Sequence, residues 1–377
     1  MILSSWRRTT VGQTIVVLAL LIGSASVTHA QKREFDVSYL GSATVIEQAG
    51  PAYPPQVIRK GQRGWVRMHF VVTPDGHAID PIIIDSSGGA GFEEEARKAT
   101  AGWRFEAPAS GAELPNNLVN IRSKKGSARE SASRDFMRRY RRIVTHLYRE
   151  EVELARLEID ATYAKGGWNL YESVMFWLMA GRVDGAEGNT VGKLEKYRRA
   201  LAVSNRKSLN GEGRREALVK IFGLEDQFGH YAHATATFAQ LEKEAENSAE
   251  LAEFGPRAAE IAALMASEKT LVANATIYSP CDCDTGEPLW YYRPERRTFS
   301  FANLNGNVQR FEARCDSKRI RGDVVEGTPW TLAPDWGSCR VFVFGDEGAT
   351  FDFLEHLHDS QEESTGDAAV ARSHVLD

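Results

Sequence analysis

Apolar and polar residues alternate along the chain near residue 70. The apolar positions of the alternation are Val66, Met68, Phe70 and Val72. The positions between them are Trp65, Arg67, His69 and Val71. A period of two is typical of a half-buried strand with one face in a core. Pro74-Asp75-Gly76 follows and suits a tight turn, because proline presets the first turn dihedral and glycine accepts a positive φ. Residues 79–84 are a second β-branched run, so the pattern predicts a hairpin.

The hydrophobic period changes after the hairpin. Apolar residues then recur three or four apart: Phe92, Ala96, Ala99 and Trp103. This spacing predicts an amphipathic helix, and a short final strand is expected at residues 118–122. Hairpin, helix and strand together indicate an α+β unit in which one helix packs on a small antiparallel sheet.

This stretch resembles a known family through several residues at once. They are Tyr53-Pro54, Gly64-Trp65-Val66, Asp75-Gly76, Ser86-Ser87-Gly88, Phe92, Trp103-Arg104-Phe105 and Pro108. In order and spacing they resemble the C-terminal domain of the TonB family, the bacterial energy transducers. The resemblance covers residues 51–122, and the remainder of the chain has to be read without it.

The resemblance implies a periplasmic protein-binding domain. In the family this domain captures an extended segment of an outer-membrane receptor as an added strand. Edge strands suit this role because their unpaired N–H and C=O groups form a template for another chain. The partner-binding residues expected here are Tyr53, Pro54, Leu118, Val119, Asn120, Ile121 and Arg122. The resemblance implies no catalysis.

The first thirty residues have the layout of a secretory signal. Arg7 and Arg8 precede an apolar run, and mostly small residues then lead to Ala30. The strictly apolar core spans residues 15–22, whereas a membrane-spanning helix needs about twenty residues. We therefore expect export to the periplasm with cleavage after Ala30. Residues 11–27, counted more generously, keep an uncleaved inner-membrane anchor as the alternative.

The chain departs from the family in two respects. Residues 31–50 are expected to be a linker, which contains no proline and spans at most about 70 Å when fully extended. The apolar segment before it lacks an internal histidine or acid, the kind of group that a proton-driven partner would couple to. Energy transduction is therefore in doubt, while partner binding is not.

The middle of the chain is expected to be helical. Residues 123–133 are small and polar and predict a linker. Apolar residues at helical spacing then run through residues 134–268, within and beyond a basic run. We interpret the basic run as the solvated face of a packed helix; contact with a membrane surface or with nucleic acid is the alternative.

Two segments of this region resemble tetratricopeptide repeats. Their equivalence is set by aligning Gly188 with Gly229, which gives a period of 41 residues. Such units cannot bury their apolar faces alone and must stack on neighbours. The pattern predicts a concave helical platform for peptides or partner domains.

Residues 271–354 predict a small β domain, because short β-rich runs alternate with Asn, Gly, Asp and Pro. Residues 355–377 are polar and mostly acidic, and we expect a disordered tail.

The four cysteines of the chain all lie in the β domain: Cys281, Cys283, Cys315 and Cys339. An even number of cysteines in an exported domain argues for disulfides. Because a bond between Cys281 and Cys283 would close a very tight ring, we expect each of them to reach Cys315 or Cys339. A zinc site is the alternative, but Cys315 and Cys339 are solitary.

Composition and motifs narrow the function classes. A net charge of −5 gives no global argument for a nucleic-acid partner. The sequence contains no Gly-x-Ser-x-Gly motif of a hydrolase, no His-Glu-x-x-His motif of a zinc protease and no phosphate loop that ends in Gly-Lys-Ser or Gly-Lys-Thr. We expect no enzyme, no cofactor and no metal site. The hypotheses are, in order, a TonB-type component of outer-membrane transport, an envelope adaptor that binds partners through its TonB-like and helical regions without energy transduction, and an envelope hydrolase or metal enzyme.

Overall fold

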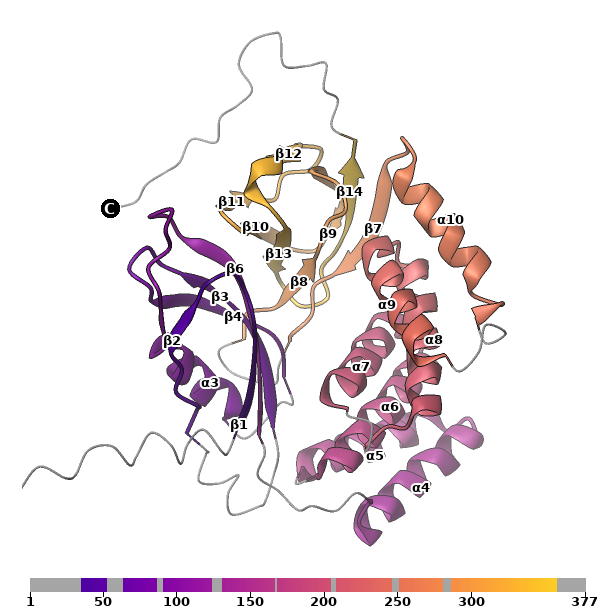
Figure 1. Ribbon diagram of the computed structural model, residues 1–377. Coiled ribbons are helices and arrows are strands. Elements are labelled where there is room, and N and C mark those ends of the chain that lie inside the picture. The colour runs from indigo at the N-terminus through magenta and orange to yellow at the C-terminus, as the bar shows by residue number, and fades with distance from the viewer. Residues whose placement is uncertain are drawn as a thin grey trace, which may run out of the picture.

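The computed structural model describes eight stretches of the chain: residues 35–52, 64–86, 91–123, 131–166, 168–204, 208–245, 251–280 and 286–357. Within these stretches the fold is mixed α+β. An N-terminal α+β unit is followed by an array of helices and then by a C-terminal β unit (Figure 1).

The N-terminal unit is built on one antiparallel sheet. Its strands are β1 (Phe35–Leu40), β3 (Trp65–Val72), β4 (Ala78–Ser86) and β6 (Leu114–Ser123). They lie in the order β1-β6-β3-β4. Helix α3 (Phe92–Ala101) packs on one face, over a core that includes Met68, Phe70 and Trp103. A short pair formed by β2 (Val45–Glu47) and β5 (Arg104–Phe105) lies beside the sheet.

The predicted hairpin, helix and last strand are all present in this unit. The turn between β3 and β4 contains Gly76 at φ 80°, where the N–H of Gly76 donates to the carbonyl of Thr73 at 2.9 Å. Helix α3 begins after Gly91, whose φ of 75° lies in the left-handed region that favours glycine. Local turn chemistry and periodicity therefore determine these elements.

The prediction of a linker over residues 31–50 is wrong where the structure describes it. Strands β1 and β2 lie within that range. Each is short and is followed by small or polar residues, so its alternation covers too few positions to stand out. Their partners, β6 and β5, lie far along the chain and are not visible in a local pattern.

The prediction that β3 is half-buried is also wrong. His69 and Val71, placed by the alternation on its outer face, are fully buried, and Trp65 is buried as well. Trp65 joins the apolar core of the helical array, while His69 contacts Phe342 of the C-terminal β unit with ring centroids 5.1 Å apart. Alternation of apolar residues shows only which face of a strand packs on the core of its own unit. In this protein the second face of β3 is covered by the helical array and the C-terminal β unit.

Seven helices form the array: α4 (Arg134–Tyr148), α5 (Val152–Lys165), α6 (Leu170–Ala186), α7 (Thr190–Val203), α8 (Gly211–Gln227), α9 (Tyr231–Glu244) and α10 (Gly255–Ala266). Helices α6 and α7 pack together, as do α8 and α9. Gly188 and Gly229 occupy equivalent turns within these two pairs, with φ of 79° and 70°. This equivalence agrees with the alignment made from sequence, while the assignment to the tetratricopeptide family stays a prediction.

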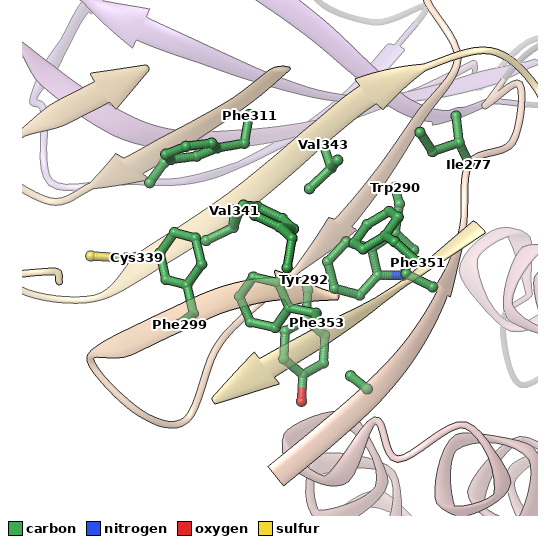
Figure 2. Packing of buried hydrophobic residues seen from close by; sticks show 14 of the residues in the cluster. Ile277, Trp290, Tyr292, Phe299, Phe311, Cys339, Val341, Val343, Phe351 and Phe353 are labelled. Carbon is green, nitrogen blue, oxygen red and sulfur yellow. The ribbon is translucent and has the colours of Figure 1, made fainter. Parts of the chain in front are cut away.

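The C-terminal β unit consists of two packed sheets. One has the strand order β11-β10-β13-β8 and the other β12-β9-β14-β7. The strands are β7 (Leu271–Thr276), β8 (Leu289–Tyr292), β9 (Thr298–Asn305), β10 (Val308–Cys315), β11 (Arg319–Asp323), β12 (Trp330–Thr331), β13 (Cys339–Gly345) and β14 (Thr350–His356). Figure 2 shows aromatic rings filling the space between the sheets, among them Phe299, Phe311 and Phe353.

A disulfide joins two neighbouring strands of the β unit. Cys315 of β10 is bonded to Cys339 of β13, and the two residues are directly opposite in the strand register. The expectation that Cys281 and Cys283 pair with Cys315 or Cys339 is therefore wrong. Cys281 and Cys283 themselves lie outside the described residues. Sequence could not choose the pairing because strand register sets which cysteines meet.

Candidate functional site

The partner-binding strand expected from sequence is β6, and both of its edges are paired. Residues from Leu118 to Arg122 face β3 on one side. On the other side β1 pairs with them in continuous antiparallel register, from Phe35 opposite Ser123 to Leu40 opposite Leu118. The expectation of a free edge at Leu118–Arg122 is therefore wrong for this conformation. The position where a partner strand would add is occupied by a strand of the same chain.

Only one face of strand β1 packs against the core of the N-terminal unit. Phe35 is buried, and Val37 and Tyr39 pack partly buried against the core beneath the sheet. The intervening residues Ser38 and Leu40 are exposed, and Leu40 has 58% of its surface accessible. An occupant of this edge thus needs apolar side chains at alternate positions.

A partly buried hydrogen bond joins β1 to β6. The hydroxyl of Tyr39 donates to Oδ1 of Asn117 at 2.6 Å, and Asn117 is fully buried. The side-chain amide of Asn117 donates to the backbone carbonyls of Leu114 and Phe70. Burial raises the pKa of Tyr39 to about 12. At neutral pH the phenol is therefore protonated, as this donor role requires.

The chain after β1 makes room for this hydrogen bond. A Cβ added at Gly41 would clash with the Tyr39 hydroxyl oxygen and with Asn117 Oδ1. Such a clash forces a side chain to move. The ring of Tyr39 also lies 6.1 Å from that of Phe70 and 5.7 Å from that of Phe105, between centroids. A residue without a side chain at position 41 is therefore needed for Tyr39 to pack in this position.

The outward face of β6 is anchored to the other two units. Leu118 packs in an apolar cluster with Leu289 and Phe342 of the C-terminal β unit. The side-chain amide of Asn116 donates to Asp316 at 2.7 Å. Arg122 donates to the carbonyl of Ala202 in α7 at 2.8 Å. Strand β6 is thus a fixed support, and β1 lies on its remaining edge.

The opposite edge of the sheet is β4, and it is blocked by several features. Pro81 has no N–H to offer an added strand, and its carbonyl accepts a hydrogen bond from Arg97 of α3. Asp80 has a φ of 48° and pairs with Arg319 of the C-terminal β unit. Register irregularities also interrupt its pairing with β3. Regular strand addition is therefore disfavoured at β4.

Arg199 of α7 joins the three units where β4 ends. Its Nε lies 2.8 Å from a carboxylate oxygen of Asp85, and both residues are buried. It also donates to the carbonyl of Pro280 and lies over the ring of Trp177, 5.2 Å from the centroid. Burial raises the pKa of Asp85 to about 6 against the opposing effect of the Arg199 charge. This pair fixes β4 to the rest of the molecule.

A small pocket of about 20 Å³ lies between α7 and strands β7 and β8. Its charged lining residues are already paired, because Arg198 binds Glu195 at 2.9 Å and Glu225 at 2.9 Å. His230, also in the lining, contacts the Asn274 carbonyl through Nε2 at 2.9 Å. Burial lowers the pKa of His230 to about 3. The charged residues and the histidine therefore hold the helical array against the C-terminal β unit, and we do not assign them to a ligand site.

The remaining residues expected from sequence have separate outcomes. Tyr53 and Pro54 lie outside the described residues, as does the apolar segment 11–27. Sequence reasoning missed β1 and Tyr39, although Phe35, Val37 and Tyr39 alternate with polar residues. Among described residues, no group of three or more His, Cys, Asp or Glu is arranged to hold a metal ion. None of the helices described is long and apolar enough to cross a membrane.

Comparison with known proteins identifies the N-terminal unit. Residues 49–119 match the family model described as "Gram-negative bacterial TonB protein C-terminal". Protein TonB of Pseudomonas aeruginosa is 36% identical over 64 residues, which are 17% of this chain and 19% of the relative. Protein TonB of Yersinia enterocolitica is 28% identical over 93 residues, which are 24% of this chain and 36% of the relative.

The likeness is confined to one part of each protein. The chain matches between about a fifth and about a third of the length of these relatives. The solution NMR structure of the Pseudomonas aeruginosa TonB CTD is 25% identical and covers 24% of this chain and 90% of that one, with a TM-score of 0.20, too low to establish a shared fold. Residues 49–119 are thus a TonB C-terminal-like domain, and β1 lies ahead of the matched residues.

Proposed function

We propose that the chain is a periplasmic, TonB-like protein-binding component of outer-membrane transport. In this proposal the N-terminal unit captures an extended segment of a partner protein by strand pairing along β6, at the edge that β1 occupies in this structure. In the proposal that segment belongs to an outer-membrane receptor, in keeping with the TonB-like domain. Catalysis, a cofactor and a metal have no part in it, and an N-terminal signal provides export.

One observation carries the strand-addition proposal. The edge of β6 holds a six-residue strand, β1, in regular antiparallel register. Backbone groups along this edge are therefore aligned to pair with an extended segment, and the core below takes up the alternate side chains of the strand that pairs there. The blocked edge at β4 has neither property.

A second candidate is an envelope adaptor that binds partners without transmitting energy. The anchoring of β6 and β4 to the helical array and to the C-terminal β unit favours it, because the domain is embedded in a larger body. The helical array would then offer a further binding surface.

Crosslinking in cells tests the proposal. A photoreactive amino acid at Asn120, which lies on β6 opposite Ser38, should capture an outer-membrane receptor. The matched control is the same group at Lys98, an exposed residue of α3. Capture of only soluble or inner-membrane proteins at Asn120 would favour the adaptor. Identical capture profiles at Asn120 and Lys98 would contradict strand addition.

A further inference from the structure

A strand that replaced β1 without bringing a hydrogen-bond donor would bury one side-chain acceptor of β6 without a partner. Oδ1 of Asn117 accepts the hydroxyl proton of Tyr39, and Asn117 has no accessible surface. The amide of the same side chain is committed to two backbone carbonyls of the sheet, so the side chain is held in one orientation. A buried acceptor that loses its donor carries a desolvation penalty. Any strand that replaces β1 therefore has to bring a donor to this position.

We propose that β1 is an internal occupant of the partner site, and that a partner segment displaces it by reproducing its pattern. The inference rests on the proposed function, since it concerns the same edge of β6. The partner segment runs antiparallel to β6 and has an aromatic, a β-branched and a hydroxyl-bearing aromatic residue at alternate positions. These three side chains take the places of Phe35, Val37 and Tyr39. Asn117 is then the residue that selects for the hydroxyl.

The contacts of β1 show why displacement is favoured over addition outside it. Strand β1 lies at the end of the sheet order, and it lies ahead of the residues that match the TonB C-terminal family. A segment paired to the outer edge of β1 would reach neither Asn117 nor the core positions below β6. It would gain backbone hydrogen bonds alone, with no side-chain selection.

If β1 occupies the partner site, the protein should bind a partner segment with reduced apparent affinity. When the site is open in only a fraction of molecules, the apparent dissociation constant rises by the inverse of that fraction. Variants that loosen β1 should therefore bind a partner segment more tightly, without any change at β6. This sets displacement apart from simple addition, for which β1 would be part of the binding surface.

A reversible lock on β1 tests the inference with the full chain. Ser38 and Asn120 are directly opposite in register, so the double variant Ser38→Cys/Asn120→Cys can form a cross-strand disulfide that holds β1 in place. The probe is a fluorescent peptide with the sequence of residues 34–41, Glu-Phe-Asp-Val-Ser-Tyr-Leu-Gly. We expect the oxidised variant to bind this peptide at least tenfold more weakly than the reduced variant. The wild type and Ser38→Cys, with and without reductant, control for the native disulfide.

Two tyrosine substitutions complete the test without a risk to folding, because each removes only a hydroxyl. Tyr39→Phe in the protein should raise peptide affinity about fivefold, the equivalent of one net hydrogen bond. Tyr→Phe in the peptide should lower its affinity for the reduced variant by about the same factor. Equal binding by the oxidised and reduced variants would overturn displacement, and equal binding by both peptides would overturn selection by Asn117.

Failure of this inference can be told apart from failure of the proposed function. If no form of the protein binds the peptide, the internal-occupant inference is wrong, whatever the crosslinking shows. If crosslinking from Asn120 still captures an outer-membrane protein in that case, strand addition stands with a partner of a different pattern. If the peptide binds as expected and crosslinking at Asn120 matches that at Lys98, the site is real and the transport proposal is wrong.

Discussion

The two edges of the N-terminal sheet are closed in different ways. At β4, a proline, a residue with positive φ and the buried Asp85–Arg199 pair combine to exclude an added strand. At β6, the edge is closed by β1, a short regular strand with one exposed face. The first edge is protected by residues of β4 and their ion pairs with other units, and the second by a separate strand.

This difference indicates which edge is suited to binding. Natural sheets protect exposed edges with proline, charges or irregular pairing, and β4 has all three. Strand β6 has none of them along Leu118–Ile121, and its pairing with β1 shows no register shift. An edge that lacks protection of its own and is covered by a short separate strand is the better candidate for a partner site.

The largest expected loss of stability comes from breaking the ion pair that holds β4. Arg199→Leu leaves Asp85 buried beside an apolar residue, and removal of one partner of a buried ion pair costs about 3–5 kcal/mol. The free energy of unfolding at pH 7, from urea denaturation, should fall by about that amount. Lys98→Gln, which removes only exposed ion pairs of α3, is the control and should cost less than about 1 kcal/mol. Equal losses would show that the pair does not fix β4.

Acid should next weaken the junction between the helical array and the C-terminal β unit, which lies outside both edges of the sheet. His230 is buried and neutral, with its pKa lowered to about 3. Below about pH 6.5 the unfolded chain binds a proton at this residue and the folded chain does not, so the free energy of unfolding falls as the pH drops toward 3. Each such histidine contributes about 1.4 kcal/mol per pH unit within that range. His230→Gln should flatten the pH dependence of urea denaturation by this slope, and an unchanged slope would contradict a buried neutral histidine.

The smallest effect is expected at β1. Tyr39→Phe removes the hydroxyl that Asn117 accepts and should cost about 1 kcal/mol, confined to the opening of β1. Hydrogen exchange of residues 35–40 should become about fivefold faster. The global free energy of unfolding should fall by no more than that amount, and exchange of residues 78–86 through local openings that leave β1 paired should stay the same. A matching change in both segments would mean that the two edges open together.

Sequence predicted the elements whose determinants are local. The Pro74-Asp75-Gly76 turn and the helical spacing after Phe92 identified the hairpin and α3. What it missed depends on contacts between distant residues. Tyr39 meets Asn117 across 78 positions, and His69 is buried by Phe342 from another unit. The disulfide between Cys315 and Cys339 likewise follows from the β10–β13 register.

Native-state hydrogen exchange of the unmodified protein tests the central claim most directly. The measurement compares residues 35–40 of β1 with residues 78–86 of β4, two edge strands of one sheet. We predict that β1 exchanges through a local opening, much faster than β4 and without dependence on global unfolding. Exchange of β1 as slow as that of β4, at the rate of global unfolding, would show that β1 is a permanent strand and would contradict the account.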